Sequence, residues 1–332
     1  MSGETETLLL APQNLAIAAT ALLIDRLFGY PKGLFDMVRH PVSWIGSVIH
    51  VLEARLNQAR YGARMRRAAG CVMLAIVIAL VLLVTIPLAL ALRQLPWGWA
   101  GEALVASFLL SQHGLEEAVR KVRDALETAL PQAREAVSHI VGRDSATLDR
   151  SGVARGAIES LAENSSDGVV APLLWLAVAG LPGIAFYKAV NTADSMVGYR
   201  TPRHEEFGWA AARLDDLVNL PAARLTAALF ALAALLPGTG DARAAVASAL
   251  RDAPRHKSPN AGWPEAAMAG ALKIRLGGPR RYDGKTVALP WLGNGRKRLT
   301  AQDIDRALIL YNRALNLLLA LVVLGWGAIL AA

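Results

Sequence analysis

The stretch that decides the fold runs from Arg155 to Arg224 and reads RGAIESLAENSSDGVVAPLLWLAVAGLPGIAFYKAVNTADSMVGYRTPRHEEFGWAAARLDDLVNLPAAR. It carries acidic and amide side chains on both sides of an apolar segment, residues 168–186. Placing such groups beside a segment apolar enough to enter a membrane costs free energy unless they bind a ligand. Helix caps and surface ion pairs are the alternative for any single residue. For the set we favour a binding site, because glycine and proline interrupt the apolar segment.

The composition indicates an integral membrane protein. Of 332 residues, 54% are hydrophobic and 19% are charged, which lies outside the usual range of soluble proteins. The single cysteine, Cys71, lies in an apolar run, so a disulfide framework and a cysteine metal site are both excluded. No Lys or Arg precedes Arg26, so we expect no signal peptide and insertion by the chain's own spans.

The apolar segments predict an all-α fold: a polytopic integral membrane protein with cytosolic helical segments and short re-entrant or broken helices. We expect one membrane-embedded domain over residues 1–332. The spans are expected at residues 8–24, 68–92, 100–112, 168–187, 221–237 and 315–332, and the polar segments at 113–167 and 238–314.

The side of the membrane follows from charge and from span length. Five arginines between Arg55 and Arg67 predict a cytoplasmic connection. Counting every apolar segment as a full crossing would split the polar centre across the bilayer. Because 168–186 and 221–236 are short, we expect both to dip into the membrane, or to be buried in protein, and to return to the same side.

Local patterns predict several boundaries. Residues 42–56 have an apolar stripe that suits a helix at the membrane surface. A helix over 115–130 is expected to end at Pro131, and Asp144 or Ser145 is expected to cap the next helix. A short hairpin is expected around Tyr282–Lys285.

The net charge of +8 is concentrated in one segment. Residues 238–313 hold 14 Lys and Arg against 6 Asp and Glu, which accounts for the whole excess. No aromatic-rich basic module of the nucleic-acid-binding kind occurs, so we expect no nucleic acid partner. The charge fits the positive-inside rule, and a polyanionic ligand is compatible with it.

The polar residues favour nucleotide or phosphoryl chemistry. Asn191 and Asp194 share a helix face, as do Glu159 and Glu163, and acids at that spacing repel unless a cation lies between them. Hard oxygen ligands suit Mg²⁺ bound jointly with phosphates. Asp215 and Asp216 are adjacent and point about 100° apart on a helix, so they cannot both contact one ligand with the same geometry. Phosphate oxygens are expected to be neutralised by Lys188, Arg200, Arg203 and Arg224.

Standard motifs are missing. The nearest approach to a P-loop, GGPRRYDGKT at Gly277–Thr286, has the wrong spacing and no strand before it. No HExxH or GxSxG occurs, and the six histidines are scattered, which argues against zinc and against an esterase triad. His40 and His256 are the two kept as ligand contacts, although each is more often an ordinary loop histidine.

One family resembles the chain closely. The matching pieces, in order, are DRLFGYP, HPVSWIG, GRDSATLD, RGAIESLAENSSDGVVAPLLW, YKAVNTADSMVGYR, FGWAAARLDDLVNLPAARLT and SPNAGWPEAAMAGAL. They cover Asp25 to about Leu276, and the chain is similar to the adenosylcobinamide-phosphate synthase family of membrane-bound cobalamin biosynthesis proteins. One departure is NLPAAR, where Pro221 lies one residue earlier than in the usual pattern.

The resemblance implies a carbon–nitrogen (acid–amine) ligase of vitamin B12 biosynthesis that uses ATP and Mg²⁺. It would join adenosylcobyric acid to (R)-1-aminopropan-2-yl phosphate, or a related amino alcohol, by an amide bond to give adenosylcobinamide phosphate. The corrinoid would lie in a groove floored by the helix of Trp44. The resemblance also implies a multi-pass protein of the cell inner membrane, in contact with lipid and with other late cobalamin-pathway membrane enzymes, with its active site on the cytoplasmic face.

The resemblance further implies residue roles. Asp194 and one of Asp215 or Asp216 would hold Mg²⁺, while Glu159 or Glu163 would accept the ammonium proton. Phosphate charge would go to Lys188, Arg200 and Arg224. Amide or corrin side chains would be oriented by Asn164, Asn191 and Asn219. The expected catalytic residues are Glu159, Glu163, Asp167 and Asp194, and the expected metal ligands are Asp194, Asp215 and Asp216. The expected substrate- and nucleotide-binding residues are His40, Arg143, Asp144, Asn164, Lys188, Asn191, Ser195, Tyr199, Arg200, Asn219, Arg224, His256, Asn260 and Glu265.

Two other functions stay open at the level of sequence. A transporter or binding protein for an anionic metabolite would use broken helices at its core and would not depend on a nucleotide. A membrane-anchored assembly factor without catalysis would leave the dense carboxylate set unexplained.

Overall fold

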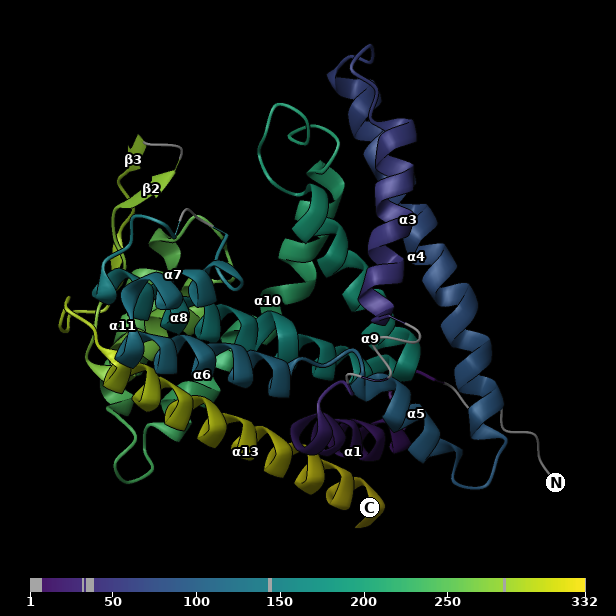
Figure 1. Cartoon of the computed structure of the whole chain (residues 1–332). Coiled ribbons are helices and arrows are strands. Elements are labelled where there is room, and N and C mark those ends of the chain that lie inside the picture. The colour runs from purple at the N-terminus through teal and green to yellow at the C-terminus, as the bar shows by residue number, and fades with distance from the viewer. Residues whose placement is uncertain (1–7, 32, 34–38, 143–144, 283–284, 332) are drawn as a thin grey trace. The chain divides into compact units, whose positions relative to one another are not determined.

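The computed structural model in Figure 1 describes residues 8–31, 33, 39–142, 145–282 and 285–331, and these are mainly helical, as predicted. The α-helices are α1 (Gln13–Phe28), α3 (Pro41–Leu56), α4 (Ala63–Arg93), α5 (Gly98–Ser107), α6 (Gln112–Thr128), α7 (Leu130–Ser138), α8 (Arg150–Ser165), α9 (Ala171–Val197), α10 (Trp209–Ala233), α11 (Ala242–Asp252), α12 (Gly262–Leu272) and α13 (Ala301–Ala331). A π-helical turn, Ser166–Val170, joins α8 to α9, and a 3₁₀ turn, Ala253–Arg255, follows α11.

The strands are short. β1 (Leu276–Gly277) pairs antiparallel with β4 (Trp291–Leu292), and β2 (Arg280–Tyr282) pairs antiparallel with β3 (Lys285–Val287). The β2–β3 register sets Tyr282 opposite Lys285, which confirms the predicted hairpin.

Among the described residues, four helices are long and apolar enough to cross a membrane: α4, the run Arg150–Val197 that includes α8 and α9, α10 and α13. This confirms a polytopic all-α membrane protein. The predicted spans at 8–24 and 100–112 correspond to α1 and α5, which have 16 and 10 residues and are shorter than the roughly 20 residues of a full crossing. Their depth in the membrane stays a prediction.

The chain divides into two compact units, so each is described by itself. Unit 1 comprises residues up to 111, 171–218 and from 322 on, and unit 2 comprises 112–170 and 219–321. The expectation of a single membrane-embedded domain stays a prediction.

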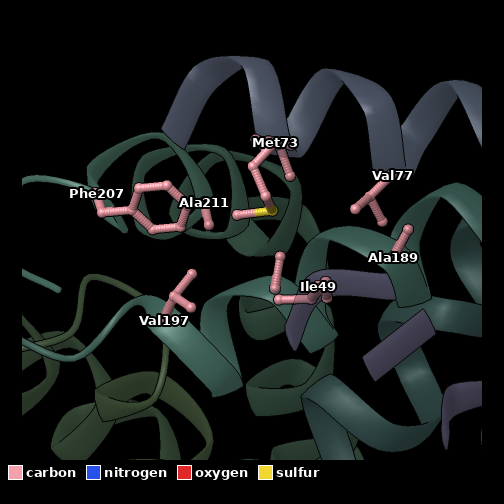
Figure 2. Close-up of a cluster of buried hydrophobic side chains, with 9 residues drawn as sticks. Ile49, Met73, Val77, Ala189, Val197, Phe207 and Ala211 are labelled. Carbon is pink, nitrogen blue, oxygen red and sulfur yellow. The ribbon is translucent and has the colours of Figure 1, made fainter. Parts of the chain in front are cut away.

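The core of unit 1 forms where α3, α4, α9 and the start of α10 meet (Figure 2). Ile49 from α3 faces Met73 of α4, and Val197 of α9 and Phe207 lie together at one end of the cluster. All four are almost inaccessible to solvent. Ile49 belongs to the predicted stripe of 42–56, and the helix found there, α3, buries it; Trp44 of the same stripe stays 51% exposed.

A buried ion pair lies at the break in α9. The helix is interrupted at Ala179 and Gly180, and Gly180 has φ +60°, a conformation open mainly to glycine. Arg93 and Glu102 form two hydrogen bonds of 2.9 and 3.1 Å there, with side chains 1% and 0% exposed. Glu102 Oε1 also accepts from the backbone N–H of Leu181 at 2.9 Å. The break predicted within 168–187 is therefore confirmed, and its backbone is satisfied by a side chain.

Unit 2 is built on α6, α7 and α8, which pack on one another, and on the pair α11 and α12. The first half of α13 is tied to α6 by side chains: Arg123 pairs with Asp305, and the Tyr311 hydroxyl donates to the carbonyl of Gln112 at 3.1 Å. The same side-by-side course of α6 and α13 is visible in Figure 1.

Three local predictions are wrong. α8 begins at Arg150, and its cap is Asp149, whose carboxylate accepts from Gly152 N at 2.6 Å; Ser145 is too far upstream, and Asp144 lies outside the described residues. Pro131 does not end a helix but occupies the first turn of α7, where its missing N–H costs little. Pro221 lies inside α10 instead of starting a separate apolar segment.

Replacement of Glu102 by Gln is expected to lower the free energy of unfolding by about 3–5 kcal/mol, because it leaves the buried Arg93 guanidinium without a counter-charge. Denaturant titration of the detergent-solubilised protein measures this change.

Glu206→Gln is the control, because it breaks the pair with Arg67, whose side chain is 52% exposed. We expect it to cost no more than about 1 kcal/mol. Equal losses of unfolding free energy in Glu102→Gln and Glu206→Gln would show that the buried ion pair does not stabilise the break in α9.

Candidate functional site

The predicted site residues are divided between the two units. Unit 1 holds His40, Lys188, Asn191, Asp194, Ser195, Tyr199, Arg200, Asp215 and Asp216. Unit 2 holds Glu159, Glu163, Asn164, Asp167, Asn219, Arg224, His256, Asn260 and Glu265. Arg143 and Asp144 lie outside the described residues.

In unit 1, the second half of α9 meets the start of α10. Asn191 Nδ2 donates to Asp215 Oδ1 at 3.3 Å, which brings together two of the predicted residues. Lys188, one turn before Asn191, is 7% exposed, and Asp215 is 9% exposed. Asp194 is half-buried, as is Asp216. Where α9 meets α10, the polar side chains therefore range from the buried cation Lys188 to the half-buried carboxylates of Asp194 and Asp216.

The exposed end of this edge is formed by Ser195, Tyr199 and Arg200, which follow as α9 ends at Val197. Tyr199 is 62% exposed. Arg203, named with them as a phosphate contact, makes instead a two-point ion pair with Glu53 at 2.7 and 2.8 Å. The hydrogen bond from Arg203 lowers the pKa of Glu53, so a phosphate contact of Arg203 would have to compete with this pair.

His40 caps α3. Its Nδ1 accepts from Val42 N at 3.2 Å, and its ring lies 4.7 Å from that of Tyr30. Burial, and then the charge of Lys188, lower the pKa of His40, against an opposing hydrogen bond with the backbone of Phe108. The neutral imidazole is therefore favoured, and His40 interacts electrostatically with Lys188.

In unit 2, the two glutamates of α8 differ. Glu159 is 5% exposed and accepts from the backbone N–H of Gly277 at 2.6 Å, which ties α8 to β1. Glu163, one turn later, is exposed. Asn164 donates back to the carbonyl of Ser160 at 2.9 Å, and Asp167 lies half-buried in the π-helical turn. Glu159 thus has a structural contact, whereas Glu163 is accessible to a substrate.

A second group in unit 2 surrounds Arg224 of α10. Its Nη1 donates to Asn260 Oδ1 at 2.7 Å, and its guanidinium lies 4.9 Å from the centre of the Trp263 ring. Asn260 is 5% exposed. The planar guanidinium is held between an amide and an aromatic face, a geometry that suits oxyanion binding.

The loop before α12 completes this group. Ser258 Oγ accepts from the backbone N–H groups of Asn260 and Ala261, both at 3.2 Å. His256 Nδ1 accepts from Ser258 N, and its Nε2 lies 3.9 Å from Glu265 Oε1, where Glu265 is 2% exposed. Sequence reasoning missed Ser258 and Trp263, although both lie in the quoted SPNAGWPE motif.

No cluster of three or more His, Cys, Asp or Glu side chains able to hold a metal ion occurs among the described residues. Asp194, Asp215 and Asp216 therefore do not form a preformed metal cage. Their oxygens still fit a Mg²⁺ that is shared with the phosphates of a ligand, because Mg²⁺ in such sites keeps few protein ligands.

Acidification is expected to destabilise the protein through His40. The folded pKa lies below the ordinary value of 6.5, so the unfolded chain binds the proton better, and stability falls as the pH drops below about 6.5. The melting temperature of His40→Asn, which keeps a cap acceptor, should fall less between pH 7 and pH 5 than that of the wild type.

His50→Asn removes an exposed histidine from the same helix and should keep the wild-type slope. Identical slopes for His40→Asn and wild type would exclude His40 as the titrating group.

Comparisons with known proteins agree on one family. A family model described as CobD/Cbib protein matches residues 18–311. "Cobalamin biosynthesis protein CobD" of Rhodobacter capsulatus is 49% identical over 323 residues, covering 94% of this chain and 98% of its own. The proteins of that name from Sinorhizobium fredii and Brucella suis are 49% and 43% identical, covering 92% and 93% of this chain and 94% and 96% of their own. No solved structure matches. The chain belongs to the CobD/Cbib family.

Proposed function

We propose that the chain is the ATP- and Mg²⁺-dependent ligase of cobalamin biosynthesis that joins adenosylcobyric acid to (R)-1-aminopropan-2-yl phosphate or a related amino alcohol. The observation that carries the proposal is the family match over residues 18–311, which includes every predicted site residue. The relatives named for cobalamin biosynthesis cover more than nine-tenths of the chain, so we extend that pathway to it.

The reaction needs an activated carboxylate, since a carboxylate does not react with an amine. In the proposed scheme ATP transfers its terminal phosphoryl group to the corrinoid carboxylate, giving an acyl phosphate and ADP. The amine nitrogen then bonds to the carbonyl carbon, the carbon–oxygen bond to phosphate breaks, and phosphate leaves. One proton passes from nitrogen to a base. Both steps gather negative charge on phosphate oxygens, so cations near them are the main requirement.

Unit 1 supplies one set of groups for this scheme. Lys188 is a buried cation beside the Asn191–Asp215 hydrogen bond, and such a cation stabilises phosphate charge strongly because water screens it little. Asp194 and Asp215 are the proposed protein ligands of Mg²⁺. The metal, when bound, would neutralise charge on the ATP phosphates. Exposed Arg200 would meet the outer phosphates.

Unit 2, considered by itself, contains further candidate groups. Hydrogen bonds among the described residues use only Nη1 of Arg224, which leaves Nε and Nη2 to form a two-point contact with a phosphate or carboxylate. For the base we favour Glu163 over Glu159, because Glu159 is buried and already accepts from Gly277 N. A base must be accessible to the substrate ammonium.

An apolar groove in unit 1 is the proposed contact for the corrinoid. It has a volume of about 310 Å³ and is lined by α3, α4, α5 and α9, including Trp44 and Val81. The sequence favours a corrinoid groove floored by the Trp44 helix, and we assign this groove to that role. The groove fits the methyl-bearing edge of a corrinoid and not the whole molecule.

The basic connection before α4 supports an inner-membrane protein with its active site on the cytoplasmic side. Contact with other membrane enzymes of the late pathway belongs to the same proposal.

A transporter of an anionic metabolite is the rival function. Broken helices serve transporters because their unsatisfied backbone groups bind the cargo. Here the Leu181 N–H at the α9 break donates to Glu102, which is paired with Arg93. We therefore favour the ligase.

Purified, detergent-solubilised protein should form amide product from adenosylcobyric acid, aminopropanol phosphate and Mg²⁺ only when ATP is present. Asp194→Asn should abolish turnover while the melting temperature stays near that of wild type, since Asp194 is half-buried at the edge of the site. Product is quantified by liquid chromatography and mass spectrometry.

Folded protein that forms no product with ATP, yet moves labelled aminopropanol phosphate into vesicles without ATP, would establish the transporter instead.

Glu163→Ala and Glu159→Ala should separate chemistry from stability. Loss of a general base lowers kcat by about 10²- to 10⁴-fold, so Glu163→Ala should do so with little change in melting temperature. Glu159→Ala should lower the free energy of unfolding by about 1–3 kcal/mol, because it leaves the buried Gly277 N–H without an acceptor. Steady-state kinetics and denaturant titration measure the two effects.

The assignment fails if Glu163→Ala keeps its turnover while folded Glu159→Ala loses it.

A further inference from the structure

The pocket at the start of α11, in unit 2, contains none of the residues assigned to the ligase reaction. It has a volume of about 510 Å³ and is lined by Ala234 and Leu235, by residues 240–243, by Ala271 and Lys273 at the end of α12, and by Arg306 of α13. Three separate helices therefore contribute to it.

The lining is cationic. Arg243, Lys273 and Arg306 face the pocket, against one carboxylate, Asp241. Asp241 already accepts from Ala244 N at 3.0 Å and pairs with Lys273 Nζ at 3.1 Å.

The acid that contacts the lining residue Arg306 is also paired. Asp303 is 1% exposed and contacts both Arg296 and Arg306, at 2.5 and 3.4 Å. Two acids, Asp241 and Asp303, therefore stand against four cations. The cations are Arg243, Lys273, Arg296 and Arg306. The excess of two positive charges favours an anionic occupant.

Lys273 ends α12 as its C-cap, with its backbone N–H donating to the carbonyls of Ala269 and Gly270. Lys273 has φ +55°, in the left-handed region that glycine or asparagine adopts more easily. The helix end therefore fixes where this lysine starts, and its side chain directs the ammonium group to Asp241 at the pocket.

The pocket opens where two apolar segments end. In α13, Arg313 is the last charged residue, and residues 314–331 carry none. Arg313 donates to the carbonyl of Pro237 at 2.7 Å and to Thr239, so the loop that follows α10 is fixed at this boundary. Residues 225–236, which come directly before this loop, are also uncharged.

The apolar surface beside the pocket is exposed. Leu235, which lines the pocket, is 69% exposed, and Leu232 one turn before it is 48% exposed. α10 and α13 are both long and apolar enough to cross a membrane. Exposed leucines beside a cationic pocket at the end of such helices suit the boundary between lipid headgroups and acyl chains.

We propose that this pocket binds the phosphate of an anionic phospholipid, with an acyl chain lying against Leu235 and Leu232. A zwitterionic headgroup fits less well, because its ammonium group would find both nearby carboxylates already paired. A free phosphate would use the cations but would leave the leucines exposed. The bound lipid would join α11, the end of α12 and α13.

The test uses the full-length protein in detergent and detergent-soluble phosphatidylglycerol, phosphatidylcholine or inorganic phosphate. Phosphatidylglycerol should raise the melting temperature to a saturating value, whereas the other two should not. Arg243→Gln removes an exposed pocket cation and should weaken the apparent affinity for phosphatidylglycerol about fivefold. Native mass spectrometry should show a matching loss of retained phosphatidylglycerol.

Arg298→Gln is the matched control, because it removes an exposed arginine of the same unit that does not line the pocket. It should keep the wild-type affinity. The proposal is overturned if Arg298→Gln weakens binding as much as Arg243→Gln, if phosphatidylcholine is as effective, or if inorganic phosphate alone gives the same shift. Ligase activity is not the readout, so the result is independent of the proposed reaction.

Discussion

The constraint on which unit 1 depends is that backbone groups in an apolar environment must find partners within the protein. Glycine at position 180 and the adjoining Pro182 break α9, and the freed N–H of Leu181 would be costly if left alone. Glu102 accepts that hydrogen, Arg93 compensates the charge of Glu102, and Asn14 accepts from Arg93 at 2.6 Å. One chain of contacts thus connects α1, the end of α4, α5 and α9, and it fixes the part of α9 that carries Lys188 and Asn191.

Local patterns were enough to predict the helix at 42–56, the long span at 68–92, the break within 168–187 and the hairpin, because each depends on neighbours in sequence. The start of α8 was not predictable in this way, since Asp144, Ser145 and Asp149 are all good caps. The choice follows distant contacts: Ser151 accepts from Leu299 N at 2.9 Å. Likewise, the position of Pro221 inside α10 was not predicted, and the same helix is contacted from far along the chain, since Trp175 donates to the carbonyl of Val218 at 3.2 Å, across 43 residues.

In the candidate site, too, local sequence patterns predict some features, whereas others depend on long-range contacts. Residue types and spacing indicated Asn191, Asp215 and Arg224, and the family resemblance added Asn260; the structure pairs Asn191 with Asp215 and Arg224 with Asn260. The pattern did not show that Arg203 is occupied by Glu53, because 150 residues separate them. It did not distinguish Glu159 from Glu163 either, since burial depends on where β1 packs. Sequence patterns therefore indicate candidate groups, while long-range packing decides which of them already have a partner in the protein.

The contact between Glu159 and Gly277 also bears on the order in which the protein is made. The two residues are 118 positions apart, and Tyr311 reaches Gln112 across 199 positions. Synthesis runs from the N-terminus at about 5–20 residues per second, so α6, α7 and α8 leave the ribosome several seconds before their partners exist. During that interval the polar side chains of α8 lack their final contacts. Unit 2 can therefore be completed only after the first half of α13 has been translated.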